Sequence, residues 1–244
     1  MNDAGSLYFG VGNAVFTAAG NKIVNNKVHD VSDASVQDAD GYGGHGIYLD
    51  DQTGLSDFEN NLVYRVSDSA VNFPGTPFAP NLQNTVKNNI FAFARLSIIK
   101  DSDFYMSGTV PSIADQVFTA SNNLMYFDRT ASSSPAFYVQ GGCTYTGGFA
   151  YSAYQQWSSN LYWRADDAFA SDTKAFHVQP KPGGGTPYGS GPSAWTFYTF
   201  AGWQTTAGED AQSAVQNPGV QQSGVSGRRL LPAQRVARSG VRGV

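Results

Sequence analysis

The sequence predicts an all-β protein folded as a right-handed parallel β-helix, a solenoid of short strands wound around one narrow core. Three observations predict this fold. The composition combines 14% charged residues with 27 glycines and 14% aromatic residues, which is typical of strands joined by tight turns. A short phrase recurs along the chain at a spacing that suits one coil. A second set of short apolar strands lies between its copies.

The recurring phrase is a pair of small polar residues followed by apolar residues. Its five copies are Asn25-Asn26-Lys27-Val28, Asn60-Asn61-Leu62-Val63, Asn88-Asn89-Ile90-Phe91, Asn122-Asn123-Leu124-Met125 and Ser159-Asn160-Leu161-Tyr162. The second asparagines follow one another after 35, 28, 34 and 37 residues. Asparagine tolerates the left-handed backbone region that a sharp corner between strands requires. Asparagines in coils stacked ~4.8 Å apart can also hydrogen-bond to one another in a ladder.

A second column of strands accompanies the corners, with the first strand before Asn25 and each of the others after a corner. Its members are Leu7-Tyr8-Phe9, Ile47-Tyr48-Leu49, Val71-Asn72-Phe73 and Ile98-Ile99-Lys100. Side chains alternate between the two faces of a strand. The pattern therefore places these residues in the core: Leu7, Phe9, Ile47, Leu49, Val71, Phe73 and Ile98. Tyr8, Tyr48 and Asn72 then share one outer face.

The C-terminal half is less regular. Residues 131–202 carry several Gly pairs and a loop from Pro180 to Pro192, which we interpret as long loops on the last coils of the same domain. The four tryptophans are interpreted as packing residues. One β-helix domain is expected over residues 1–218. A basic segment over 219–244, with no aromatic and no acidic residue, is expected to be disordered or weakly attached.

The charge distribution disfavours nucleic acid as a partner. Five of the 15 Lys and Arg residues follow the last acidic residue, Asp210. The rest of the chain holds 10 basic against 19 acidic residues, a net charge of 10 − 19 = −9. Such a body offers no basic face to phosphates, and neutral sugars or cations suit it better. The expected partner is a polysaccharide or oligosaccharide. The oligomeric state is not predicted.

Cysteine content and hydropathy predict neither disulfides nor a membrane span. Cys143 is the only cysteine, so no disulfide framework is predicted and the thiol is interpreted as a small buried group. The chain has no apolar run of about 18 residues and no basic-then-apolar leader after Met1. No membrane span is expected.

Several motifs resemble those of a known group of proteins. The string Gly43-Gly44-His45-Gly46-Ile47-Tyr48-Leu49-Asp50-Asp51, together with Asp3-Ala4-Gly5-Ser6-Leu7-Tyr8, resembles bacterial right-handed parallel β-helix repeat proteins, including those related to glycoside hydrolases of fucosides and xylan. Asn160-Leu161-Tyr162-Trp163-Arg164 and the region from Gly202 to Pro218 are similar to their terminal coils. The resemblance implies that this chain is the C-terminal portion of a longer β-helix and that the protein is secreted or periplasmic.

Two carboxyl groups are the candidate catalytic pair. Asp50 shares the outward face of Tyr48, and Asp3 leads into the Tyr8 strand, so stacked strands would bring the two acids onto neighbouring coils. Glycoside hydrolysis uses two carboxyl groups, about 5–5.5 Å apart in retaining and about 6.5–9.5 Å apart in inverting enzymes. The resemblance implies that Asp3 and Asp50 are catalytic, with Asp51 as the alternate. Residues 50–54 also suit a plain turn.

Aromatic and polar side chains near these acids are candidate sugar ligands, because aromatic rings stack on sugar rings and polar groups fix their orientation. They are Tyr8, Tyr42, His45, Tyr48 and Asn72. No cofactor and no metal site are predicted, although Asp101 and Asp103 beside Lys100 leave a calcium site open. Two alternatives to hydrolysis remain on the same fold: a polysaccharide lyase or epimerase, and a non-catalytic carbohydrate-binding or surface solenoid.

Overall fold

A computed structural model describes residues 5–9, 21–32, 44–50, 54–74, 84–102, 106–108, 118–127, 136–140, 143–145, 155–178 and 196–219. Most of these residues lie in strands, and the strands form three principal sheets. Sheet A consists of β1 (Gly5–Phe9), β4 (His45–Leu49), β7 (Ser69–Pro74), β10 (Ser97–Ser102), β14 (Phe137–Gln140), β18 (Phe176–Val178) and β19 (Thr196–Tyr198). Sheet B consists of β2 (Lys22–Val24), β5 (Asp57–Glu59), β8 (Asn84–Lys87), β12 (Phe118–Ser121) and β16 (Gln155–Ser158).

Sheet C consists of β3 (Lys27–Val31), β6 (Leu62–Val66), β9 (Ile90–Ala92), β13 (Leu124–Phe127), β17 (Leu161–Arg164) and β20 (Ala214–Val215). A small separate pair joins β11 (Met106–Gly108) to β15 (Cys143–Tyr145). Among the described strands, every pairing is parallel except that of β18 with β19.

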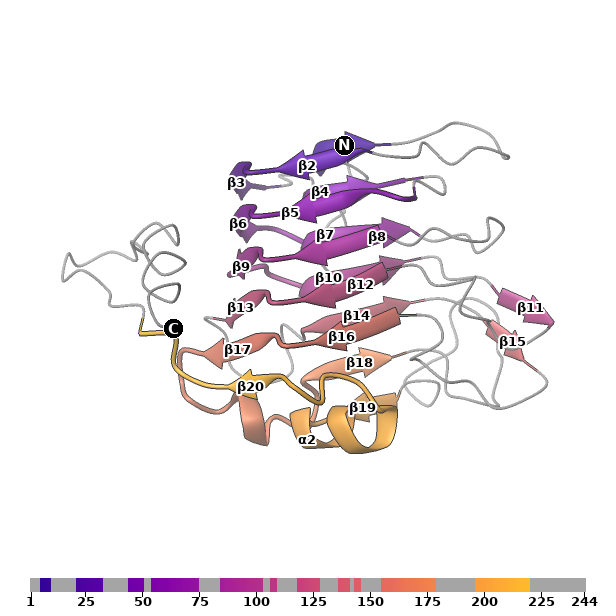
Figure 1. The fold of residues 1–244 in the computed structure, drawn as a ribbon, viewed down its shortest axis with the longest axis vertical. Coiled ribbons are helices and arrows are strands. Elements are labelled where there is room, and N and C mark those ends of the chain that lie inside the picture. The colour runs from indigo at the N-terminus through magenta and orange to yellow at the C-terminus, as the bar shows by residue number, and fades with distance from the viewer. Residues whose placement is uncertain are drawn as a thin grey trace.

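Successive strands visit the three sheets in a fixed order. The chain runs from a strand of sheet B to one of sheet C and then to one of sheet A, and the cycle repeats one position further along each sheet. Figure 1 shows the result as a stack of strands from the indigo N-terminal end to the yellow C-terminal end. The predicted all-β architecture with parallel sheets is confirmed, and this arrangement is compatible with a parallel β-solenoid.

The corner between sheets B and C is built as the repeat predicts. The first residue of each copy adopts the left-handed conformation, with φ of 61° at Asn25, 57° at Asn60 and Asn88, 55° at Asn122 and 56° at Ser159. The second residue forms a ladder along the stack. The Nδ2 of each asparagine donates to the Oδ1 of the next at 3.0, 2.9, 3.1 and 3.1 Å through Asn26, Asn61, Asn89, Asn123 and Asn160.

The asparagine ladder ends on a carboxylate. Asn160 Nδ2 donates to Asp210 Oδ1 at 2.9 Å, and the Asn160 backbone N–H donates to Ser213 Oγ at 2.7 Å. Tyr162 donates its hydroxyl to the other Asp210 oxygen at 2.6 Å. Asp210 and Ser213 therefore satisfy the last polar groups of the ladder at the C-terminal end.

The inner stack matches the alternation except in one strand. Ile47, Leu49, Val71 and Phe73 are buried in one hydrophobic cluster, and Leu7 and Phe9 pack against it. In β10 the residue in register with Val71 is Ile99, not Ile98. Both isoleucines are fully buried, so two adjacent apolar residues gave no way to choose the inward one. The predicted core position of Ile98 is confirmed, but Ile99 is the residue that continues the row of Ile47 and Val71.

Aromatic side chains close the C-terminal end of the core. Trp203 begins a π-helical turn (Trp203–Ala207) after α2 (Phe200–Gly202), and its ring stacks on Phe176 at 4.6 Å. Trp157 packs edge-on against Trp203, with ring centres 6.2 Å apart. The predicted packing role is confirmed for these two tryptophans, whereas Trp195 lies outside the described residues. No described helix is long and apolar enough to cross a membrane.

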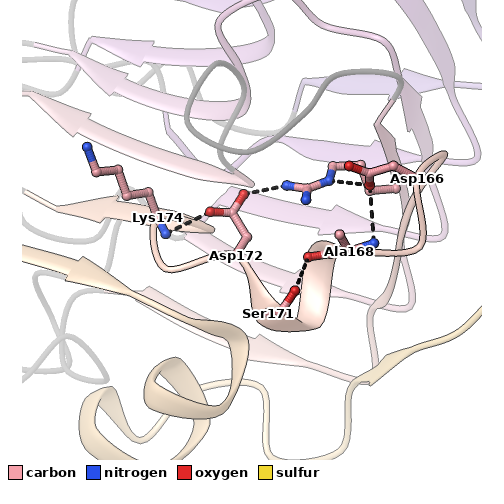
Figure 2. A network of polar contacts seen from close by, with 6 residues as sticks. Asp166, Ala168, Ser171, Asp172 and Lys174 are labelled. Carbon is pink, nitrogen blue, oxygen red and sulfur yellow. Dashed lines mark hydrogen bonds and ion pairs between the residues drawn. The ribbon is translucent and has the colours of Figure 1, made fainter.

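An ion-pair network around the buried Arg164 supports the same end of the molecule. Arg164 donates from Nε to Asp166 at 2.6 Å and from Nη1 to Asp172 at 2.6 Å (Figure 2). Asp172 also accepts the backbone N–H of Lys174 at 2.8 Å. Hydrogen bonds from Arg164 lower the pKa of Asp166, against an opposing effect of burial. This network ties β17 to the chain around the short helix η2 (Phe169–Ser171).

Glu209 predicts a pH-dependent stability. Its side chain is 3% exposed and Oε2 accepts the Trp157 backbone N–H at 2.9 Å. Burial, and then the charge of Asp210, raise the pKa of Glu209 to about 8. The folded state therefore holds a proton that the unfolded chain releases near pH 4.5, and stability falls as the pH rises between these two values. Glu209→Gln is expected to flatten this fall in thermal melts from pH 5 to 9.

The control for this experiment is Glu59→Gln, because Glu59 lies partly exposed at the end of β5. This variant should keep the wild-type dependence of stability on pH. Asp210 also has a raised pKa through burial, so some slope will remain in Glu209→Gln. A slope equal to that of the wild type would contradict the assignment to Glu209.

Candidate functional site

One row of side chains crosses the face of sheet A opposite to the core. Tyr8 is in register with Tyr48, Tyr48 with Asn72, and Asn72 with Lys100. These residues alternate along their strands with members of the hydrophobic cluster. Strand alternation therefore directs the four side chains to the same side of the sheet. The prediction that Tyr8, Tyr48 and Asn72 share one face is confirmed, and Lys100 joins them.

Asp50 lies at the end of this row nearest the N-terminus. Its backbone N–H donates to the Phe9 carbonyl at 2.6 Å, which extends the pairing of β4 with β1 by one residue. This places the Asp50 carboxylate beside Tyr8, whose hydroxyl donates a hydrogen bond to Oδ2. Tyr8 is 50% exposed and Asp50 is partly exposed. Tyr8 and Asp50 thus form an accessible pair of an aromatic ring and a carboxylate.

Tyr48 packs against the Tyr8 ring of this pair. Its ring meets the Tyr8 ring edge-on, with ring centres 5.1 Å apart and planes at 86°. Such an edge-to-face contact is favourable because the edge of one ring is positive and the face of the other is negative. Tyr48 itself is only 3% exposed. The position of Tyr8 over the sheet is therefore set by a ring that solvent barely reaches.

A cluster of buried polar side chains lies beside Tyr48. The His45 ring lies 5.0 Å from the Tyr48 ring, its Nδ1 is 2.7 Å from Ser69 Oγ, and its Nε2 is 3.3 Å from Asn72 Nδ2. Because the Asn72 amide nitrogen can only donate, His45 Nε2 accepts and Nδ1 carries the proton. All of these polar side chains are at most 1% exposed.

His45 is neutral in this setting. Burial, and then the nearby charge of Lys100, lower the pKa of His45 to about 3. Its Nδ1 lies 3.6 Å from Asp68 Oδ1, but the neutral imidazole makes this a dipolar contact and not an ion pair. His45 is therefore a fixed hydrogen-bonding link at physiological pH and does not titrate there.

Asp68 and Lys100 form a buried ion pair at the centre of the group. Lys100 Nζ lies 3.1 Å from Asp68 Oδ2 and 3.4 Å from Oδ1, and the two side chains are 0% and 1% exposed. A buried charge is tolerated when an opposite charge and hydrogen bonds compensate its lost hydration. Contacts through His45 and Tyr48 connect this ion pair to the accessible Tyr8–Asp50 pair.

The structure thus brings together five of the predicted site residues: Tyr8, His45, Tyr48, Asp50 and Asn72. Asp3, Tyr42 and Asp51 lie outside the described residues, and their roles stay predictions. Asp68, Ser69 and Lys100 were not predicted to belong to the site. The register of β10 would have found Lys100, because the residue after the inward Ile99 must face the same side as Asn72.

The described residues contain no group of three or more His, Cys, Asp or Glu side chains that could hold a metal ion. Of the two acids considered for calcium, Asp101 lies in β10 and Asp103 lies outside the described residues. Lys100, which adjoins Asp101, is already engaged with Asp68.

No family model matches this sequence, and neither a curated protein nor a solved structure matches it.

Proposed function

We propose that this protein is a carbohydrate-active, right-handed parallel β-helix that hydrolyses glycosidic bonds in a polysaccharide with two carboxyl groups, one of them Asp50. The observation that carries the proposal is the accessible Tyr8–Asp50 pair on sheet A. An exposed tyrosine ring offers a stacking face for a sugar ring. The adjacent carboxylate is the group that glycoside hydrolysis requires beside the scissile bond. A secreted or periplasmic location belongs to the same proposal.

The buried residues behind the pair suit a supporting role. Catalytic groups must be held in place by neighbours whose own positions are fixed. Tyr48 contacts Tyr8, His45 contacts Tyr48, and Asn72, Ser69, Asp68 and Lys100 surround His45. We therefore assign Tyr48, His45 and Asn72 to positioning of the pair. Tyr8 would contact the sugar directly.

Asp3 is the proposed second carboxyl group, with Asp51 as the alternate. Asp3 precedes β1 by two residues, and β1 is the strand that carries Tyr8. One carboxyl group would protonate the leaving oxygen, and the other would act as the base or nucleophile. The distance between the two groups would decide whether the anomeric configuration is retained or inverted.

A lyase mechanism receives less support from this site. Elimination from a uronide needs a base that can reach the sugar. Lys100 is the basic residue in the row, but it is 1% exposed and bound to Asp68. A calcium-dependent lyase also needs a cluster of acidic ligands. We therefore place hydrolysis first and binding without cleavage second.

Asp50→Asn tests the proposal. The variant keeps the size of the side chain and an acceptor for the Tyr8 hydroxyl but removes the charge, so cleavage of fucosides or xylan is expected to fall by at least about 100-fold. Cleavage is measured as released reducing sugar, and ultraviolet absorbance of unsaturated products reports elimination. Asp57→Asn, on sheet B, is the matched control and should keep wild-type activity.

Three outcomes separate the candidate functions. Activity lost in both Asp50→Asn and Asp3→Asn supports the two-carboxylate mechanism. Unchanged cleavage by both variants would remove it. Binding of oligosaccharide by the wild type in isothermal titration, with no product formed, would assign the site to carbohydrate binding alone.

A further inference from the structure

The outer face of sheet C carries a row of aromatic side chains. Register joins His29 to Tyr64, Tyr64 to Ala92, Ala92 to Tyr126 and Tyr126 to Trp163. Beside Ala92, Phe93 adopts a left-handed φ of 56° and its ring packs edge-on against Tyr126 at 5.0 Å. Five coils therefore each supply one ring. The aromatic row consists of His29, Tyr64, Phe93, Tyr126 and Trp163.

These rings do not belong to the core. The residue before each member of the register row is buried in the hydrophobic cluster, in the order Val28, Val63, Phe91, Met125 and Tyr162. Alternation then turns His29, Tyr64, Tyr126 and Trp163 outward. His29 is exposed and the other members of the aromatic row are partly exposed. With coils ~4.8 Å apart, the aromatic row extends over ~19 Å along the stack.

Sheet B shows that the fold itself does not require such a row. The equivalent outward row of sheet B is Lys22, Asp57, Thr85, Thr119 and Gln156. It comes from the same five coils and contains no aromatic residue. An ordinary solvated outer face is thus available to this chain. The aromatic row on sheet C is therefore not imposed by the coils themselves.

The charges around the aromatic row indicate a neutral ligand. Arg65 lies over the Tyr64 ring at 4.6 Å and Lys27 at 5.8 Å, while the His29 ring stacks on Tyr64 at 5.0 Å. Arg65 is bound to Asp30, with Nη2 2.6 Å from Oδ2. The charge of Arg65 is therefore compensated, and Tyr126 and Trp163 are uncharged. An anionic ligand such as a nucleic acid strand would meet little net positive charge.

The exposed atoms also favour a sugar over an apolar protein surface. The adjacent outward row of sheet C contains Leu62 and Leu124, which are 7% and 9% exposed, and Ile90 and Leu161, which are partly exposed. The accessible surface therefore combines apolar side chains with the polar groups of His29, Tyr64, Tyr126 and Trp163. Sugars combine an apolar ring face with hydroxyl groups and match such side chains.

We propose that the aromatic row is a second carbohydrate-binding surface, which holds a neutral linear polysaccharide along the stack and apart from the Tyr8–Asp50 pair on sheet A. This inference rests on the proposed function for its choice of ligand class. Its role is to retain the polymer while the site on sheet A acts on one bond. It requires no chemistry of its own.

The test measures retention of the protein in native gels that contain xylan or a fucose-rich polysaccharide. Tyr126→Leu/Trp163→Leu keeps apolar bulk but removes two stacking faces, and its apparent affinity is expected to fall about tenfold. Tyr64→Leu/Tyr126→Leu is an independent second variant, and circular dichroism checks that both fold. Thr85→Ala/Thr119→Ala, on sheet B, is the control and should be retained like the wild type.

The outcomes distinguish this inference from the proposed function. The variants of the aromatic row should still cleave a short aryl glycoside at the wild-type rate, whereas Asp50→Asn should lose cleavage but keep polymer retention. The inference would be overturned if neither polysaccharide retained the wild type. It would also be overturned if both row variants were retained as strongly as the wild type. Two further results would overturn it. One is that the row variants lose binding to oligothymidylate but not to polysaccharide, and the other is that their sole effect, in size-exclusion chromatography, is to dissociate a dimer.

Discussion

Asp68→Asn is expected to lower the free energy of unfolding by about 3–5 kcal/mol, because it leaves the Lys100 ammonium buried without its counter-charge. Asp68 is 0% and Lys100 1% exposed, so water cannot take over the role of the carboxylate in the folded state. The asparagine keeps the size of the side chain, which separates the charge effect from a cavity. Urea unfolding followed by circular dichroism measures the change.

A double variant identifies the origin of this effect. Asp68→Asn combined with Lys100→Met removes both charges, so its loss of stability should be smaller than that of Asp68→Asn alone. The exposed pair of Asp30 and Arg65 is the natural control, since its side chains are 52% and 40% exposed. Asp30→Asn is expected to cost about 0–1 kcal/mol. Equal losses in Asp68→Asn and Asp30→Asn would show that burial of the Asp68–Lys100 pair is energetically unimportant.

The same substitution bears on the candidate site. Asp68 contacts His45, His45 contacts Tyr48, and Tyr48 contacts Tyr8. A shift of the ion pair is therefore expected to reach the Tyr8–Asp50 pair through packed side chains. In an active enzyme, Asp68→Asn should lower kcat and raise KM together, because the shift reaches Tyr8, the proposed sugar contact, and through Tyr8 the Asp50 carboxylate.

The parts of the fold that depend on local sequence could be predicted. The first residue of each phrase is left-handed and the second, an asparagine, forms the ladder, because both properties depend on the residue itself and on the coil spacing. The shared face of Tyr8, Tyr48 and Asn72 followed from alternation in strands with one apolar face. These features needed no knowledge of distant contacts.

Features that depend on register between strands could not be predicted. Ile98 and Ile99 are both apolar and both buried, so the pattern did not reveal that Lys100 faces the site. Asp68 lies between two serines in a segment that suits a turn, and only the fold brings it to Lys100. The aromatic row was not predicted either. Its members are spread over five phrases, and the apolar residues of these phrases suggested core packing.

Asn89→Ala is expected to lower the free energy of unfolding by about 2–4 kcal/mol, because it interrupts the asparagine ladder in the middle. Asn89 is 1% exposed. Its Oδ1 accepts from the backbone N–H and the Nδ2 of Asn61, both at 2.9 Å, and its Nδ2 donates to the Phe58 carbonyl at 2.8 Å. The substitution therefore leaves several buried polar groups without a partner, at about 1–3 kcal/mol for each group that water cannot reach.

The position of a residue in the asparagine ladder should decide the size of the loss. Asn26 is only partly buried, and its amide donates to Asn61 at 3.0 Å and to the Val24 carbonyl at 3.3 Å. Water can replace these bonds at the first described coil, so Asn26→Ala should cost about 1 kcal/mol or less. Asn89→Asp tests polarity separately, since a carboxylate still accepts from both Asn61 donors but cannot donate to Phe58 or Asn123.

The hydrogen bonds of the asparagine ladder run in one direction and end at Asp210. Each asparagine amide of the ladder donates one N–H to the next member toward the C-terminal end, and the last one donates to the Asp210 carboxylate. Hydrogen bonds in such a chain polarise one another in the same sense. In Asn89→Ala the backbone N–H of Asn61 loses its acceptor directly, so faster exchange at Asn61 is expected in either case. Polarisation along the ladder predicts faster exchange also at Asn26 and Asn123, whose own acceptors stay in place. Faster exchange confined to Asn61 would mean that the bonds of the ladder act independently.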